Sequence, residues 1–151
     1  YRMPPSQLRK VLVDAWGDDF LTNFISFDVD PIAAASVGQV HKCKTTKNET
    51  LAIKVQYPGI KDSINSDLEN IGFLLKKSGL IPNSIPLEKL LKEAEIQLLQ
   101  EVDYVVESQN LNNFSKLLKN NPYFDVPKLH QEFSTTKTLA MEFKRGITIN
   151  Y

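Results

Sequence analysis

The chain has 151 residues, of which 42% are hydrophobic and 24% charged, with 6 Gly and 8 Pro. This composition is typical of one globular domain and excludes disordered and collagen-like chains. Lys and Arg together number 18, as do Asp and Glu, so the net charge near zero gives no indication of a nucleic-acid partner. The only cysteine is Cys43 and the only histidines are His41 and His130, which excludes an internal disulfide and leaves no ligand set for structural zinc.

The ends of the chain also limit what it can be. No apolar run approaches the ~20 residues of a membrane-spanning helix, and no apolar core of a signal peptide follows residues 1–5. With its single cysteine, the chain fits a reducing compartment. Neither Tyr1 nor Tyr151 resembles a natural terminus, so we expect this chain to be a piece of a longer protein.

Residues 1–25 are expected to form a helical extension. Ser6 can serve as the N-cap of a first helix, apolar residues then recur every three or four positions from Leu8 to Trp16, and Gly17 is expected to end it. Residues 19–24 are predicted to form a further short helix. Residues 26–31 are predicted to form a strand that ends before a proline.

Residues 26–56 are expected to contain strands and a loop rich in alanine. Residues 37–43 and 51–56 are predicted to form a β-hairpin around the polar turn at residues 45–49. In the second strand the side chains of Leu51, Ile53 and Val55 share one face because side chains alternate with period two. Lys54 therefore points to the other face.

The remaining chain is expected to be mainly helical, with a strand region at its end. Residues 60–79 are predicted to form an amphipathic helix, and residues 84–120 a longer one with an interruption near Asn110. Residues 126–132 and 137–143 are strand candidates, which end before Lys144. We therefore predict a mixed α+β domain.

Residues 31–40 lie between two predicted strands and contain a run of small side chains, namely Ala33, Ala34, Ala35 and Ser36. A loop of this kind lets a ligand approach the backbone, whose N–H groups can hold phosphate. Alanine lacks the positive-φ freedom of glycine, so this loop is expected to be stiffer than a glycine loop. The alternative is a tightly packed shoulder of the hairpin.

Lys54 is the second candidate for chemistry. Its ammonium needs a partner if it is partly enclosed, whereas an edge-strand lysine in water needs none. Candidate partners are the acidic residues of the longest predicted helix: Asp103 and Glu107 are four residues apart and share a helix face, and Glu101 is expected to serve another partner. A solvated acidic helix face is the alternative.

The histidines and the cysteine are interpreted as structural. His41 alternates with Gln39 and Cys43 on one strand face, and neither His41 nor His130 has a nucleophile or a metal ligand nearby in the sequence. Cys43 is predicted to be a small buried hydrophobe.

The order of these features is that of a protein-kinase N-lobe: a small-residue loop, a hairpin, a strand lysine, an acidic helix and two final strands. Three segments are more specific. They read AAASVGQVH at residues 33–41, AIKVQYPG at residues 52–59 and EVDYVVE at residues 101–107. Over residues 4–151 the chain resembles the UbiB/AarF family of atypical kinases, which acts in coenzyme Q biosynthesis. The resemblance implies a kinase-like N-lobe with a small antiparallel sheet, a long acidic helix equivalent to helix αC, and extra helices of the family around residues 8–16 and 64–75.

The resemblance also assigns roles to residues. It implies that Lys54 contacts the α- and β-phosphates of ATP, that Glu107 pairs with Lys54, and that Glu101 and Asp103 form the acidic E-x-D pair that engages an N-terminal extension. The alanine-rich loop would replace the kinase glycine loop over the phosphates. The nucleotide-binding residues implied in this way are Ala33, Ala34, Ala35, Ser36 and Lys54, together with Met141, Glu142 and Phe143 where the last strand enters the hinge that meets adenine.

Two parts of the family pattern are absent from this sequence. The K-x-G-Q motif of the extension is expected upstream, and the C-lobe, with its catalytic Asp and Asn and its metal-binding D-F-G, is expected downstream. The Mg²⁺ ligands are therefore expected in the C-lobe and none in this chain. We expect this chain alone to be inactive.

Two hypotheses of function follow from the resemblance. The first is the ATP-binding N-lobe of an atypical kinase or ATPase that supports coenzyme Q biosynthesis, with a small-molecule or lipid acceptor favoured over a protein. The second is a non-catalytic pseudokinase scaffold that binds lipids or biosynthetic proteins. The resemblance also implies a mitochondrial protein on the matrix side of the inner membrane, with membrane lipids and quinone-biosynthesis proteins as partners.

Overall fold

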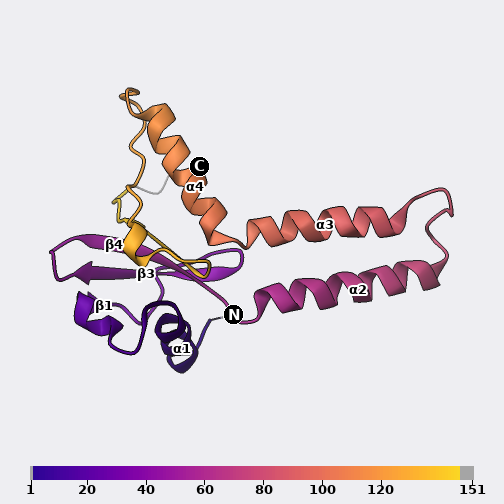
Figure 1. Cartoon of the computed structure of the whole chain (residues 1–151), viewed down its shortest axis with the longest axis horizontal. Coiled ribbons are helices and arrows are strands. Elements are labelled where there is room, and N and C mark those ends of the chain that lie inside the picture. The colour runs from indigo at the N-terminus through magenta and orange to yellow at the C-terminus, as the bar shows by residue number, and fades with distance from the viewer. Residues whose placement is uncertain (1, 147–151) are drawn as a thin grey trace.

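The computed structural model describes residues 2–146, in which one antiparallel sheet carries helices on both faces (Figure 1). The sheet order is β1-β3-β4-β5, and β2 pairs with β3 beside β1. The strands are β1 (Phe24–Phe27), β2 (Ala33–Ala34), β3 (Gly38–Thr45), β4 (Thr50–Gln56) and β5 (Thr138–Glu142). The helices are α1 (Pro5–Trp16), α2 (Ile60–Ser78), α3 (Leu87–Glu101) and α4 (Tyr104–Leu118), with 3₁₀ helices η1 (Phe20–Asn23) and η2 (Gln131–Phe133). The predicted α+β class and small antiparallel sheet are confirmed.

The β3–β4 hairpin forms where the sequence predicts it. Its turn contains Asn48, which adopts the left-handed region at φ 66°. In β4 the side chains of Leu51, Ile53 and Val55 are fully buried, while Lys54 is only partly enclosed. The predicted alternation is therefore confirmed, and Lys54 lies on the face of the sheet that is opposite the aliphatic side chains.

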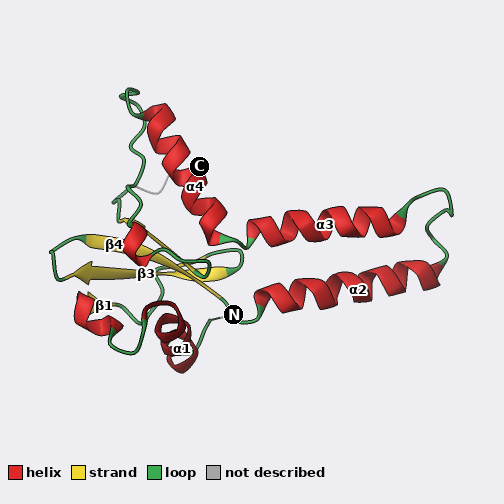
Figure 2. Cartoon of the chain, viewed as in Figure 1, coloured by secondary structure: helices red, strands yellow, loops and turns green. Residues whose placement is uncertain are grey.

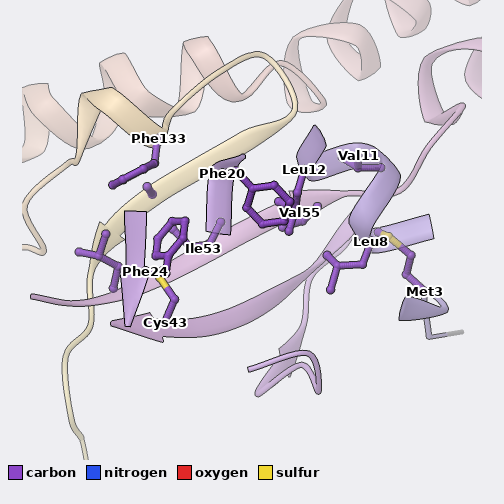
Figure 3. Packing of buried hydrophobic residues seen from close by; sticks show 12 residues of the cluster. Met3, Leu8, Val11, Leu12, Phe20, Phe24, Cys43, Ile53, Val55 and Phe133 are labelled. Atoms are coloured by element: carbon purple, nitrogen blue, oxygen red, sulfur yellow. The ribbon is translucent and has the colours of Figure 1, made fainter. Parts of the chain in front are cut away.

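One face of the sheet carries the hydrophobic core. Leu8, Val11 and Leu12 of α1 pack there, and Figure 3 shows Leu12 and Phe20 beside Val55. At the other end of this face the aromatic rings of Trp16, Phe24 and Phe133 pack against one another in tilted and edge-to-face arrangements, with centroids 4.9 to 5.6 Å apart. Large buried side chains of this kind supply most of the stabilisation of a small domain.

A chain of buried hydrogen bonds ties the N-terminal segment to the sheet. The Met3 N–H donates to Gln39 Oε1, and the Gln39 amide donates to Nε2 of His41 at 2.9 Å. Nδ1 of His41 donates to the carbonyl oxygen of Asp28 at 2.8 Å. Because Nδ1 carries the proton and Nε2 accepts, His41 is neutral. This agrees with its interpretation as a structural residue.

The other face of the sheet is covered by the start of α4. The Gln56 side-chain amide at the end of β4 donates to the carbonyl oxygen of Val102, with nitrogen and oxygen 2.5 Å apart, and Val102 itself is buried. The Tyr104 N–H donates to the Thr136 carbonyl oxygen at 3.4 Å. These contacts fix the N-terminus of α4 against the strand that carries Lys54.

Helices α2 and α3 form an antiparallel hairpin that projects away from the sheet (Figure 2). At their crossing Gly72 is buried, and a Cβ on it would lie 2.6 Å from Leu91. Further out, Lys76 of α2 pairs with Glu88 of α3 at 2.6 Å. The hairpin therefore begins and ends at the sheet but makes its main contacts within itself.

The structure corrects the prediction of one helix over residues 84–120. That segment forms α3 and α4, and the break lies at Val102 and Asp103 rather than near Asn110. Asp103 leaves helical geometry at φ −92° and ψ 102°, and its carboxylate accepts from the Val105 N–H at 2.9 Å. Asp103 is the N-cap of a new helix, which is the physical reason for the break.

Other boundaries also differ. Residues 126–132 form no strand. This segment precedes β5 in the chain, contacts it through an isolated bridge between Leu129 and Met141, and then enters η2. The first strand is shifted to residues 24–27, and residues 20–23 form a 3₁₀ helix. The N-cap of α1 is Pro4 and not Ser6, because Pro5 occupies the first helical position, which proline favours. Residues 1 and 147–151, including both terminal tyrosines, lie outside the described residues.

Candidate functional site

The centre of the site is an ion pair between Lys54 of β4 and Glu107 of α4. Lys54 Nζ and Glu107 Oε1 are 2.5 Å apart. The lysine side chain is 22% exposed and the glutamate 39%, so the pair is partly screened from water. Since the residues are 53 positions apart in the sequence, the pair links the sheet to the helix.

An open cleft of about 520 Å³ lies beside this pair, within the size range of small-molecule sites. Of the residues singled out in the sequence, four line it: Ser36, Lys54, Glu101 and Glu107. The other lining side chains are mostly polar, and they come from α3 and α4 with Val37 beside Ser36. The cleft offers one ammonium, two carboxylates, a hydroxyl and several side-chain amides to a ligand.

The alanine-rich segment lies at the sheet edge next to this cleft. Ala33 and Ala34 form β2, and Ala33 pairs with Val40, which in turn pairs with Lys54. The Ala35 N–H donates to the Gly38 carbonyl oxygen at 2.9 Å, which closes a tight turn around Ser36. Ala33 is therefore in register with Lys54, but none of the three alanines lines the cleft as Ser36 does.

The two residues of the acidic pair have different surroundings. Glu101 is the last residue of α3 and lines the cleft. Asp103 uses its carboxylate as the N-cap of α4 and does not line the cleft. The sequence predicted one helix in which Asp103 and Glu107 share a face and Glu101 serves another partner. The structure instead has a helix junction between Glu101 and Asp103.

The predicted hinge residues lie at the end of β5. Met141 pairs with Ala52 and lies on the same face of the sheet as Lys54, while Glu142 pairs with Leu51. The Lys144 ammonium lies 3.0 Å from the Glu142 carboxylate and holds the pKa of Glu142 below its usual range. Phe143 lies against the Lys42 ammonium, 4.9 Å from the ring centroid. These residues are separate from the cleft at Lys54.

Comparison with known proteins identifies the family. The ABC1 atypical kinase-like domain matches residues 1–151. The chain belongs to the ABC1 atypical kinase-like family. Among curated relatives, this ABC1 domain is 40% identical to the mitochondrial atypical kinase COQ8 of Saccharomyces cerevisiae, over 97% of this chain and 29% of that protein. It is 38% identical to the mitochondrial atypical kinase COQ8B of Rattus norvegicus, over 98% of this chain and 28% of that protein.

Relatives also occur beyond mitochondria. The chloroplastic protein ACTIVITY OF BC1 COMPLEX KINASE 8 of Arabidopsis thaliana is 33% identical over 97% of this chain and 20% of its own length. Among solved structures, the Mycobacterium tuberculosis protein Rv3197, in its complex with erythromycin, superposes with a TM-score of 0.81 at 28% identity, over 97% of this chain and 37% of that chain. The ABC1 domain therefore spans less than half the length of the relatives it matches, and the protein-kinase-like N-lobe fold is supported.

Three residues of the site in this ABC1 domain escaped the sequence analysis. Tyr104 lines the cleft and is 1% exposed, with the Lys54 ammonium 5.3 Å from its ring centroid. Gln56 anchors the helix junction through Val102. Gly38 lies so close to β4 that a Cβ on it would be 2.2 Å from the Val55 carbonyl oxygen. The sequence contains a signal for two of these residues, because Gln56 shares the strand face of Lys54 and Tyr104 is three residues before Glu107 on a helix.

The remaining titratable candidates of the ABC1 domain are inert. Cys43 is buried, and burial raises the pKa of its thiol to about 12, so it stays protonated as predicted for a small hydrophobe. His130 lies 3.1 Å from Glu49, far along the sheet from Lys54. Burial lowers the pKa of His41. These groups stabilise the fold and do not take part in the site.

The residues of the cleft fit a phosphate group better than a metal ion. Lys54 and the Ser36 hydroxyl can compensate and hydrogen-bond phosphate oxygens. Within residues 2–146 no group of three or more His, Cys, Asp or Glu side chains could hold a metal ion.

Proposed function

We propose that this ABC1 domain is the ATP-binding N-lobe of an atypical kinase or ATPase that supports coenzyme Q biosynthesis. The observation that carries the proposal is the Lys54–Glu107 pair, whose nitrogen and oxygen are 2.5 Å apart beside the cleft lined by Ser36. In kinase-like folds a strand lysine paired with a helix glutamate holds the nucleotide phosphates. Phosphoryl transfer to a small-molecule or lipid acceptor, or ATP hydrolysis, is proposed over transfer to a protein.

In this proposal each residue has a definite task. Lys54 compensates phosphate charge, and Glu107 keeps the lysine side chain extended toward the cleft instead of into solvent. Ser36 and the backbone of the turn closed by Ala35 and Gly38 approach the phosphates from the sheet edge. Met141, Glu142 and Phe143 are placed against adenine by the family resemblance. The N–H groups of Glu142 and Phe143 already donate to the carbonyl oxygens of Lys128 and Thr50, so this contact would use other backbone groups. Mg²⁺ would neutralise phosphate charge when bound, with its ligands in the C-lobe.

The test is nucleotide binding by the full-length protein. Lys54→Ala is expected to weaken ATP affinity at least tenfold and to abolish turnover, because a charge-assisted contact to phosphate is lost. The matched control is Lys116→Ala, which removes an exposed lysine from α4 and is expected to change neither quantity. Unchanged affinity and turnover in Lys54→Ala would show that Lys54 does not bind nucleotide.

A second measurement separates an enzyme from a scaffold. In cells that lack the protein, the wild type is expected to restore quinone synthesis and Lys54→Ala is expected to fail at equal protein abundance. Full rescue by Lys54→Ala would favour the scaffold hypothesis, in which Lys54 and Glu107 form only a structural ion pair.

We further propose that the protein acts in mitochondria, on the matrix side of the inner membrane, with lipids and quinone-biosynthesis proteins as partners. The end of the α2–α3 hairpin supports a lipid contact. Residues 78–87 contain no charged side chain, and Leu80 is 81% exposed at the far end of the hairpin. Lys76 pairs with Glu88 and Lys92 with Glu95, and Lys77 and Lys89 are two further cations that flank this end. Apolar tips flanked by lysines bind anionic membranes through both terms.

The membrane contact is tested by flotation with lipid vesicles. Binding is expected to vesicles of phosphatidylcholine mixed with an anionic phospholipid and to be weak with phosphatidylcholine alone. Leu80→Asp is expected to reduce binding, whereas the control Leu21→Asp, an exposed leucine of η1, is expected to retain it. Equal binding by both variants would exclude the tip as the contact. Among residues 2–146 no helix is long and apolar enough to cross a membrane.

A further inference from the structure

We propose that Tyr104 is a positioning residue of the site, whose ring holds the Lys54 ammonium together with Glu107. Tyr104 is the first residue of α4, and Glu107 follows one turn later on the same side of the helix. The Lys54 ammonium lies 5.3 Å from the centroid of the Tyr104 ring and 2.5 Å from the Glu107 carboxylate. A cation within about 6 Å of an aromatic face is attracted by the ring quadrupole.

The hydroxyl of Tyr104 does not explain why a tyrosine is buried here. Among the described residues it is a buried side-chain polar atom without a hydrogen-bond partner. Leaving a hydroxyl unpaired in the interior costs free energy, whereas the ring contributes packing and the contact with Lys54. Burial and the nearby Glu107 charge raise the pKa of Tyr104 to about 12, so the side chain stays neutral. We therefore assign the positioning role to the ring.

The backbone of Tyr104 is held by hydrogen bonds and its side chain is buried, so the residue is fixed in place. The backbone N–H of Tyr104 donates to Thr136, and its carbonyl oxygen accepts from the Ser108 hydroxyl at 2.8 Å. Val102 lies two positions before Tyr104, and its carbonyl oxygen is held by the Gln56 side chain. A Cβ on Gly38 would come within 3.0 Å of the Tyr104 oxygen, so Gly38 packs closely against the hydroxyl end of the side chain.

Two contacts on Lys54 do more than one. Glu107 alone could hold the ammonium at several positions around its carboxylate, because that carboxylate is more than one-third exposed. The Tyr104 ring is a second contact, so it restricts the ammonium to positions near both the ring face and the carboxylate. Both contacts lie at the cleft that Ser36 also lines. Lys54 is therefore oriented before any ligand binds, which lowers the entropic cost of binding.

The benefit of this role for ATP binding rests on the proposed function. The contact between Lys54 and the Tyr104 ring can be tested without a nucleotide. Nuclear magnetic resonance on the full-length protein, labelled at lysine with ¹³C and ¹⁵N, reports the ε-methylene protons of Lys54. We expect them to be shifted upfield by the Tyr104 ring current and to show nuclear Overhauser contacts to the ring protons. Both signals are expected to persist in Tyr104→Phe and the upfield shift to disappear in Tyr104→Leu. The control, Phe114→Leu, removes an exposed ring from the same helix and is expected to leave Lys54 unchanged.

Nucleotide affinity in the full-length protein gives a second result. Tyr104→Leu is expected to weaken ATP binding by about two- to fivefold, the size of a partly exposed cation–π contact, and Tyr104→Phe is expected to retain wild-type affinity. Equal losses in the Phe and Leu variants would overturn the assignment to the ring.

The outcomes separate this inference from the proposed function. If Lys54 shows no contact to the Tyr104 ring in the wild-type chain, the positioning role is wrong, whatever the variants do; this measurement requires no folded variant. If the contact and the ring-current shift are present but the wild-type protein binds no ATP, the proposed function fails while the positioning of Lys54 by Tyr104 stands.

Discussion

The close approach of the β3 and β4 backbones at Gly38 gives the sharpest stability prediction. A Cβ at this position would lie 2.2 Å from the Val55 carbonyl oxygen, 2.9 Å from its carbonyl carbon and 3.0 Å from the Tyr104 oxygen. The first distance falls about 1.2 Å short of the 3.4 Å at which ordinary contact begins, and the obstacle is backbone rather than a mobile side chain. Gly38→Ala must therefore push two paired strands apart.

The expected cost is at the upper end of the range for overpacking, about 3 kcal/mol. For a chain of this length, each 1 kcal/mol lowers the Tm by about 2–4 °C, so we expect Gly38→Ala to lower it by about 6–12 °C. Thermal unfolding of the chain followed by circular dichroism measures this change. The control is Gly146→Ala, because nothing lies within 4 Å of a Cβ at Gly146.

Two outcomes would refute this reasoning. A Tm within about 2 °C of wild type would mean that the strands yield at little cost, contrary to the close packing of protein interiors. Restoration of the wild-type Tm by adding Tyr104→Phe to Gly38→Ala would place the conflict at the phenol oxygen instead of the Val55 backbone.

Three further predictions concern capping, pH and activity. Asp103→Ala removes the N-cap of α4 and is expected to lower the free energy of unfolding by about 1 kcal/mol in urea titrations, and Asp103→Asn is expected to restore most of it; no loss in the alanine variant would contradict the capping role. Burial lowers the pKa of His41 in the folded chain, although the hydrogen bond to the Asp28 backbone opposes this shift. The contribution of neutral His41 to stability is therefore present above the unfolded pKa of about 6.5 and is lost as the pH falls toward the folded value. Urea titrations from pH 7 to pH 5 measure this loss, and His41→Gln is expected to flatten the profile. The isolated chain is expected to show no Mg²⁺-dependent ATP hydrolysis in a phosphate-release assay, and measurable turnover would contradict the need for C-lobe ligands.

The part of the site that lies on strands was predictable from the sequence. Alternation with period two is enough to place Lys54 opposite Leu51, Ile53 and Val55, because a strand has only two faces. The same rule places Gln56 on the face of Lys54, but it does not predict that Gln56 binds the Val102 carbonyl oxygen. The burial of Cys43 follows in the same way from its position in β3.

The helix that faces Lys54 could not be placed by periodicity. Val102 and Val105 continue the apolar spacing of the preceding residues, so the pattern predicted one helix where the structure has a break. The break depends on two interactions. Gln56 of β4 binds the Val102 carbonyl oxygen, and the Asp103 carboxylate caps the next helix. Asp103 was a visible N-cap signal. The partner on the sheet was not visible in local sequence.

The pairing of Lys54 with Glu107 was the family expectation, and the sequence alone left it open. Spacing places Asp103 and Glu107 on one helix face but contains no information about which sheet residue meets that face. The geometry makes the choice, because Asp103 is occupied by the Val105 N–H and Glu101 belongs to the previous helix, which leaves Glu107 within reach of Lys54.

The same junction explains how the domain can carry a long projecting hairpin beside a site that depends on ångström-scale positioning. The hairpin of α2 and α3 rejoins the sheet at Val102, where Gln56 holds the backbone, and α4 restarts at Asp103 with its own cap. In one continuous rigid helix, displacement of α3 would also rotate α4. Because a new helix begins at this break, α3 can bend or move without rotating α4. Tyr104 and Glu107, the two residues that hold Lys54, both lie beyond this break. The fold thereby separates the exposed hairpin from the helix turn that fixes the lysine.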